Sequence, residues 1–371
     1  MSSNATRATD TPTDGDSATP ATQSEAFPGL PNHVVIEHIL GADTDPLVLA
    51  MLSAVSLAMH DTVAATGIEV EELTSERAAQ LGHLDMLQHK LDTGRLDKSN
   101  VCKFTAVGGK LEVLQWLRGN DCPWCPNTTA GAAKGGHFEV LHWAHENGCP
   151  WNEWSCEWAA RGGHLEVLQW LHVGGCPWDK ETCAMAAMNG QLKVLQWLRG
   201  NGCPWHEVTC KLAAKGGNLE VLQWAVKNGC PWDEDTCAMA AENGHLEVLQ
   251  WAHANGCPWD ATTCTFAAFG GHFPTLHWAV VNGCPWEEET CAMAAGTGDM
   301  FVLQWARANG CLWNERTCTM AASAGHLEVL QWAIENECPC DWEQCRMEAQ
   351  ENNRLDVVAW LEDNEPPMEV E

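Results

Sequence analysis

The sequence places a tryptophan every 27 residues over most of its length, and this period limits the folds that the chain can adopt. These tryptophans are Trp116, Trp143, Trp170, Trp197, Trp224, Trp251, Trp278, Trp305 and Trp332. The residues between two of them also recur with little change. A fixed period of this length indicates one supersecondary unit stacked many times. Such arrays usually bind other molecules and do not transform them.

Each unit predicts two short helices joined by a tight turn. In residues 245–253 the apolar positions fall on one helical face, and this second helix ends at Gly256, where Pro258 prevents its continuation. The first helix is preceded by a residue whose side-chain oxygen can cap its free amides. The capping candidates are Asn152, Asp179, Asp233, Asp260 and Asn314.

Neither helix reaches the roughly 12 to 15 residues that an isolated helix needs for marginal stability in water. Stability must therefore come from stacking, and we expect the recurring tryptophans to form a buried ladder along the core. The predicted fold is all-α, a solenoid of helix-turn-helix repeats.

The string Ala-Ala-x-x-Gly-His-Leu-Glu-Val-Leu, at residues 240–249 and 321–330, resembles the centre of the ankyrin repeat. The usual ankyrin period is about 33 residues. The shortfall lies before the first helix, where ankyrin repeats carry a β-hairpin, and the family's Thr-Pro-Leu-His signature is also replaced. The resemblance implies an ankyrin-like stack without the hairpin, with about 11 units in residues 77–362 and degenerate end units.

Residues 27–66 break the period and resemble an F-box. The positions that match the F-box and would bind an adaptor are Leu30, Pro31, Val34, Val35, Ile39, Leu40, Leu49 and Leu52. The chain departs from the family at Leu57 and Met59, where a basic residue and then an aromatic residue are usual. The resemblance implies binding to the Skp-type adaptor of a cullin-type ubiquitin ligase. The alternative is a helical cap over the first repeat.

The remaining ends, residues 1–26 and 363–371, have little apolar material to bury, and we expect both to be disordered. The formal charge of −30, with the 20 Lys and Arg scattered, argues against nucleic acid and anionic membranes as partners. A neutral or basic protein client is more compatible with this negative charge. The sequence opens without an apolar core and has no apolar run of 18 residues, so we expect a cytoplasmic or nuclear protein.

The 20 cysteines recur in pairs seven residues apart, such as Cys149 with Cys156. Equivalent cysteines of neighbouring units should lie about 8 to 10 Å apart, too far for disulfides or for four ligands of one zinc ion. We expect reduced, buried thiols and no metal or cofactor. A bond within one repeat, a site that uses His164 and the lone pair Cys122 with Cys125 remain alternatives, so a metal or redox protein is a third function class.

We interpret the recurring histidines before the second helices as turn and capping residues. They are His137, His164, His245, His272 and His326. No nucleophile with a base, phosphate-binding glycine loop or carboxylate pair stands out, so we expect no enzyme activity.

Positions that differ between units predict the partner-binding surface. On the first helix they lie two residues before, one after and five after the recurring cysteine, which places them on one face. They include Trp154, Glu157, Arg161, Glu181, Ala184, Met188, Val208, Lys211, Lys215, Asp235, Ala238, Glu242, Thr262, Thr265, Phe269, Glu289, Ala292 and Gly296. We call them the stripe. The ankyrin resemblance puts the stripe in a concave groove, with Trp154, Arg161, Met188 and Phe269 as anchors.

The sequence therefore predicts a non-catalytic adaptor that recruits a protein client to a ubiquitin ligase. The alternatives are a plain repeat scaffold and, for the stripe, an ordinary solvated surface on which Trp154 packs locally.

Overall fold

The structure, a computed structural model, describes residues 73–125 and 127–365, which form 22 helices and no strand. The helices alternate between the first and the second helix of successive repeats, so the predicted all-α helix-turn-helix solenoid is confirmed. The segment that resembles an F-box, residues 27–66, lies outside the described residues with all eight of its predicted adaptor-binding positions.

The first helices are α4 (Ser75–Leu81), α6 (Val101–Val107), α8 (Thr128–Gly135), α10 (Glu153–Gly162), α12 (Lys180–Met188), α14 (Glu207–Lys215), α16 (Glu234–Glu242), α18 (Ala261–Phe269), α20 (Glu288–Gly296), α22 (Glu315–Ala324) and α24 (Trp342–Glu351). The second helices are α5 (Leu84–Asp92), α7 (Leu111–Gly119), α9 (Phe138–Glu146), α11 (Leu165–Val173), α13 (Leu192–Gly200), α15 (Leu219–Lys227), α17 (Leu246–Ala254), α19 (Phe273–Val281), α21 (Met300–Ala308), α23 (Leu327–Glu335) and α25 (Leu355–Asn364).

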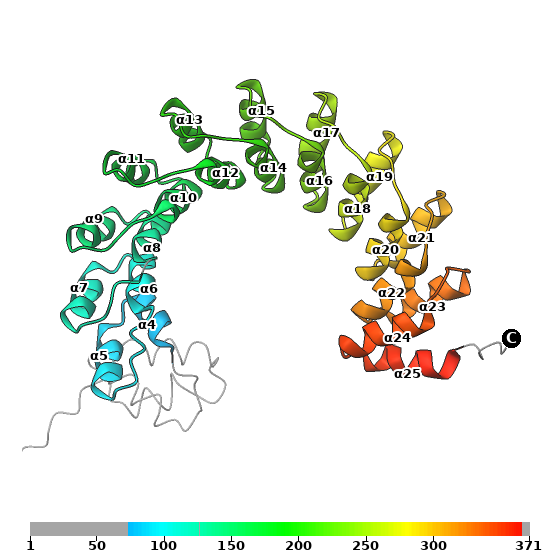
Figure 1. The fold of residues 1–371 in the computed structure, drawn as a ribbon, viewed down its shortest axis with the longest axis horizontal. Helices are drawn as coiled ribbons and strands as arrows, with labels where there is room; N and C mark the ends of the chain where they lie inside the picture. Colours follow the sequence, from blue (N-terminus) through cyan, green and yellow to red (C-terminus); the bar gives the residue numbers. More distant parts are fainter. Residues whose placement is uncertain (1–72, 126, 366–371) are drawn as a thin grey trace, which may run out of the picture. The chain divides into compact units, whose positions relative to one another are not determined.

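Contacts along the chain divide it into two compact units, residues 1–78 with 83–96 and residues 79–82 with 97–371. In the second unit each first helix packs against the first helices before and after it. These helices follow the inner side of a curved row, while the second helices follow its outer side (Figure 1). We call the inner surface the first-helix face.

Capping residues fix where the first helices begin, and all five predicted positions are N-caps. The side-chain oxygens of Asp179, Asp260 and Asn314 accept hydrogen bonds from the backbone amides two residues later, at 2.9 to 3.0 Å. Asn152 and Asp233 hold the same position without a side-chain bond. Polar caps therefore set the boundary, and the loops before them contain no strand.

The core consists of aliphatic, alanine and cysteine side chains, and the prediction of a buried tryptophan ladder is wrong. Leu195 and Leu198 of α13 are fully buried, whereas Trp197 is only half-buried. Small residues such as Ala213 let the neighbouring helices approach, and the leucines fill the space between them. The tryptophan lies at the edge of this apolar core, where it packs against another indole.

Recurring histidines join one repeat to the next. His164 is the N-cap residue of α11, but its side chain makes no capping bond. Its Nε2 instead donates to the carbonyl oxygen of Lys134 in the preceding repeat, at 3.1 Å. Asn218, at the equivalent position two repeats later, donates its amide to the Met188 carbonyl at 2.8 Å. For His137, His164 and His245 the predicted capping role is therefore replaced by a bond between repeats, whereas the side chains of His272 and His326 make no capping bond.

Candidate partner-binding pocket

The stripe has an exposed part and a buried part. Trp154 and Phe269 are the most open of its anchors, with 44% and 51% of their surface accessible. The half-buried members are Glu157, Arg161, Glu181, Met188, Val208, Lys211, Lys215, Asp235, Glu242, Thr265, Glu289 and Gly296. The alanines Ala184, Ala238 and Ala292 are fully buried, which corrects their placement on the surface. Adjacent first helices pack so closely that a side chain as short as alanine does not emerge between them.

A cavity of about 550 Å³ opens on the first-helix face across α6, α8 and α10. Three predicted stripe residues, Trp154, Glu157 and Arg161, line it. The other lining residues were not predicted: Gln80, Lys103, Phe104, Val107, Asn127, Ala130, Gly131, Lys134, Trp158 and Met185. The remaining half-buried stripe residues and Phe269 lie elsewhere. We call this cavity the α8 pocket.

A single missing side chain explains why the cavity lies here. At intervals of 27 residues the same repeat position holds Phe104, Gly131, Trp158, Met185, Leu212, Met239, Phe266, Met293, Met320 and Met347. Gly131 is thus the one small residue in a row of large apolar ones. A Cβ atom there would lie 2.9 Å from the Lys103 carbonyl oxygen, so even alanine would push α8 away from α6. Comparing repeats at this position would have found the cavity from the sequence.

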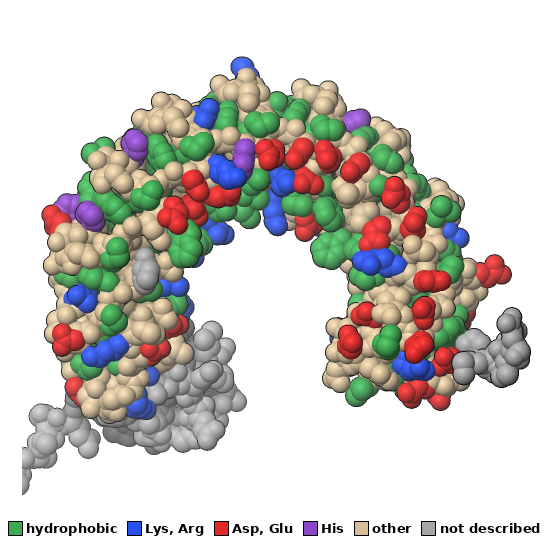
Figure 2. All heavy atoms as spheres, in the orientation of Figure 1, with side chains coloured by type: hydrophobic (Ala, Val, Ile, Leu, Met, Phe, Trp, Pro, Cys, Tyr) green, Lys and Arg blue, Asp and Glu red, His purple; other side chains and the backbone are tan. Residues whose placement is uncertain are grey.

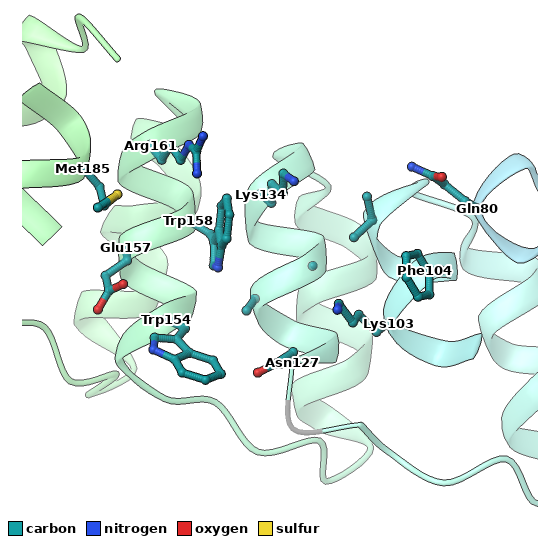
Figure 3. A pocket seen from close by; sticks show the side chains of 13 residues that line it. Gln80, Lys103, Phe104, Asn127, Lys134, Trp154, Glu157, Trp158, Arg161 and Met185 are labelled. Atoms are coloured by element: carbon teal, nitrogen blue, oxygen red, sulfur yellow. The ribbon is translucent and has the colours of Figure 1, made fainter. Parts of the chain in front are cut away.

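Three cations surround the aromatic rings of the α8 pocket. Lys134 Nζ lies 4.7 Å and Arg161 Cζ 4.9 Å from the ring centroid of Trp158, distances at which cations are attracted to an aromatic face. Lys103 Nζ lies 5.1 Å from the centroid of Phe104. Figure 3 shows Trp158 between the labelled Lys134 and Arg161 side chains, with Trp154 one turn below. Sequence reasoning missed Lys134 because its repeat has Thr129 in place of the reference cysteine.

These three cations form no ion pair with any described residue. Some other cations of the first helices do. Lys211 pairs with Asp235 of the next repeat, and this hydrogen bond raises the pKa of the lysine. Arg316 pairs with a glutamate of the preceding repeat at 2.9 Å. The α8 pocket therefore gathers three unpaired cations at one cavity, whereas the unpaired Lys180 and Lys215 of later first helices do not line it.

Glu157 is the carboxyl group of the pocket. Burial raises its pKa, and the negative charges of Asp179, Glu181 and Glu153 add to the effect. In Figure 3 it lies on the side of α10 that faces Met185, whereas Trp158 and the two cations lie on the side of Lys134. Its position leaves the cations free to meet an external anion.

Acidic side chains dominate the first-helix face beyond the pocket. Figure 2 shows Asp and Glu gathered over α16 to α24, with few Lys or Arg among them. From α16 to α24 the first helices thus carry more carboxylates than cations.

The cysteines have structural roles in the part of the chain that is described. All 20 are free, and only Cys340 is not buried. Loop thiols donate to backbone carbonyls one repeat earlier, as Cys203 does to Asp179 at 3.2 Å. No group of three or more Cys, His, Asp or Glu among the described residues is arranged to hold a metal ion. From Cys156 to Cys318 the contact partner of the helix cysteine is the loop thiol of the next repeat, as for Cys183 with Cys203, and not the cysteine seven residues away.

Cys340 departs from this pattern because it replaces the loop tryptophan found in the preceding repeats. Its Sγ lies 3.7 Å from Sγ of Cys345. Hydrogen bonds donated by the thiols of Cys318 and Cys345 lower the pKa of Cys340.

Among the described residues, no helix is both long and apolar enough to cross a membrane. The family model of ankyrin repeats matches residues 132–172 and 237–280. No curated protein matches the sequence. Among the solved structures that the chain matches is the ankyrin repeat domain of human ASB11, at 16% identity, with a TM-score of 0.36, over 42% of this chain and 84% of that one. Two stretches of the repeat array are therefore similar to ankyrin repeats, although the described helix pairs have no hairpin between them.

Proposed function

We propose that this chain is a non-catalytic adaptor, which binds a client protein on its first-helix face and brings it to a cullin-type ubiquitin ligase in the cytoplasm or nucleus. The α8 pocket is the observation that supports client binding. It combines exposed Trp154, half-buried Trp158 and Arg161 in one concavity, and these are residue types that dominate binding energy at protein interfaces.

The scaffold favours such binding because its surface is already organised. Each first helix is held by its neighbours on both sides, so the pocket residues lose little freedom when a partner binds. The first-helix face also continues along successive repeats, which allows a client to make further contacts beyond the pocket. Stripe residues such as Met188 and Phe269 would serve as these outer contacts.

The ligase role is supported by the resemblance of residues 27–66 to an F-box. Leu30 and Pro31 stand where the family begins its adaptor-binding helix, followed by the apolar positions Val34 and Val35. Such residues would bind a Skp-type adaptor, while the repeats hold the client.

Calorimetric titration of the whole chain with a Skp-type adaptor tests this role. We expect micromolar or tighter binding that is lost when Leu30 and Pro31 are both replaced by Ala. The variant Trp154→Ala is the matched control, because it removes an exposed aromatic from the pocket and should leave adaptor binding unchanged. An adaptor that does not bind the unaltered chain would contradict the ligase role and leave a client-binding scaffold whose N-terminal helices form a cap.

A further inference from the structure

We infer that the α8 pocket binds an acidic peptide segment of the client. In this arrangement the carboxylates of the peptide meet Lys134 and Arg161, and a neighbouring apolar side chain enters the space above Gly131. The inference rests on the proposed function, because it names the chemistry of the client at the same surface. It also reverses, for this pocket, the preference for a basic client that the charge of the whole chain suggests.

The placement of the cations is the first argument. Lys134 and Arg161 both lie within 5 Å of the centroid of one ring, so their charged groups are at most about 10 Å apart. Two like charges this close repel each other, and a carboxylate placed between them relieves the repulsion and gains charge-assisted hydrogen bonds. Lys103, on the opposite side of α8, extends the positive potential along the pocket.

The lack of internal partners is the second argument. The chain has 50 Asp and Glu for only 20 Lys and Arg, yet few of the described cations are in an ion pair. Lys211 and Arg316 each find a partner on an adjacent first helix. In the α8 pocket the adjacent helices instead present Phe104, Ala130 and Trp158. An anion that neutralises these cations must therefore come from outside the described residues.

The shape of the cavity is the third argument. A volume of about 550 Å³ is more than one side chain occupies, and it lies within the range of well-formed ligand sites. Phe104 and Trp158 lie on either side of α8 (Figure 3), and Ala130 with Gly131 adds lining that has no polar side chain. A leucine or phenylalanine side chain in this space would bury apolar area, while the cations at the rim hold the flanking carboxylates.

Other occupants fit less well. A basic peptide would bring its charges against Lys103, Lys134 and Arg161, and the one carboxyl group of the pocket, Glu157, faces the other side of α10. A nucleic acid would meet the cations but would also meet the acidic first helices beyond them, in a chain of formal charge −30. Both alternatives serve as competitors in the experiment.

The test uses the full chain and a short fluorescein-labelled peptide in which Glu alternates with Leu, measured by fluorescence anisotropy at low salt. We expect saturable binding that weakens as salt is raised, because the contacts are charged and partly exposed. Replacing Lys134 and Arg161 by Gln should weaken it at least tenfold, the effect of losing about 1.5 kcal/mol of charged hydrogen bonding. Replacing the Leu of the peptide by Ala should also weaken it about tenfold.

The matched control is the double variant Lys193→Gln with Lys227→Gln. Both lysines are exposed on second helices, and the control changes the net charge of the chain by the same amount. Its affinity should stay within about twofold of the unaltered chain. The variant Lys134→Arg with Arg161→Lys keeps both positive charges but changes the shape of the two donor groups, so it should lose less binding than the Gln variant; this comparison separates loss of charge from unfolding.

Four outcomes would overturn the inference: no binding of the acidic peptide, equal losses in the pocket and control variants, tighter binding of a peptide with Lys in place of Glu, or displacement by a single-stranded oligonucleotide. The adaptor titration separates this failure from failure of the proposed function. A chain that binds the Skp-type adaptor but not the acidic peptide loses only the assignment of client chemistry to the α8 pocket.

Discussion

The indole of Trp178 meets the indole of Trp197 edge to face, with their centroids 5.6 Å apart and their planes at 72°. Comparable pairs recur along the array, as for Trp151 with Trp170 and Trp205 with Trp224. Each pair joins the loop before a first helix to the second helix of the same repeat. The recurring tryptophans therefore tie the loops to the helices on the outer side and do not fill the core.

This pairing sets the expected cost of truncating Trp197. A buried tryptophan replaced by alanine costs about 3 to 5 kcal/mol, but Trp197 is half-buried, so we expect about 2 kcal/mol. The fully buried Leu195 in the same helix should cost more when it is replaced by alanine, about 3 kcal/mol. Thermal unfolding of the two variants shows which substitution costs more stability. A larger loss of stability for Trp197→Ala than for Leu195→Ala would contradict the edge position of the tryptophans and indicate that they form part of the core.

The bond from His164 to the Lys134 carbonyl predicts a selective response to substitution. His164→Ala removes the donor and should cost about 1 kcal/mol. His164→Asn should recover most of the loss, because Asn218 makes the same bond two repeats later. Thermal midpoints of the three proteins compare these effects. Equal losses for Ala and Asn would show that the ring contributes by packing and not by its hydrogen bond.

Two glycines at helix ends should respond in opposite directions to alanine. At Gly216 a Cβ atom would lie 2.0 Å from the Met188 carbonyl oxygen, so Gly216→Ala must separate two first helices and should cost at least about 1 to 3 kcal/mol. Gly200 ends α13 with open space around it, and Gly200→Ala should stabilise by about 0.5 to 1 kcal/mol. Chemical denaturation measures the change in the free energy of unfolding of both variants. Similar effects at the two sites would argue against close first-helix packing.

The raised pKa of Glu157 predicts a pH-dependent gain from Glu157→Gln. Above the pKa of the folded chain the carboxyl is ionised in both states, and its burial near other acids disfavours folding. Below the usual value of 4.5 it is protonated in both states and the penalty disappears. The variant should therefore melt at a higher temperature than the unaltered chain at pH 7, by a margin that shrinks toward pH 5. Exposed Glu166→Gln is the control and should show no such trend.

Cys340 should be the first thiol of the native chain to react with a maleimide reagent. It is half-exposed while the other 19 cysteines are buried, and the lowered pKa keeps its thiolate present below the pH that ordinary thiols require. Mass spectrometry should find one rapid addition, which persists below pH 7 and disappears in Cys340→Ser. Several additions at the same rate would contradict the burial of the loop and helix cysteines.

The sequence by itself determined the period, the helix-turn-helix unit and the helix starts. These features are local, because they depend on caps such as Asp179, on left-handed turns such as Gly256 and on apolar spacing within one repeat. It also showed which positions of the first helix vary, including Trp154 and Arg161. These features can be predicted without knowing how the repeats contact one another.

Only the tertiary structure decided how deeply each side chain is buried and which side chains meet. Trp197 and Leu195 are both large and apolar in the same helix, but stacking buries the leucine and leaves the tryptophan at the edge. Likewise Ala184 is covered because first helices pack side by side, whereas Lys134 and Arg161 of successive repeats converge on one indole. The α8 pocket lies where Gly131 lacks the large side chain that the other repeats carry at this position. These outcomes depend on distances between repeats, which a pattern read along one repeat does not contain.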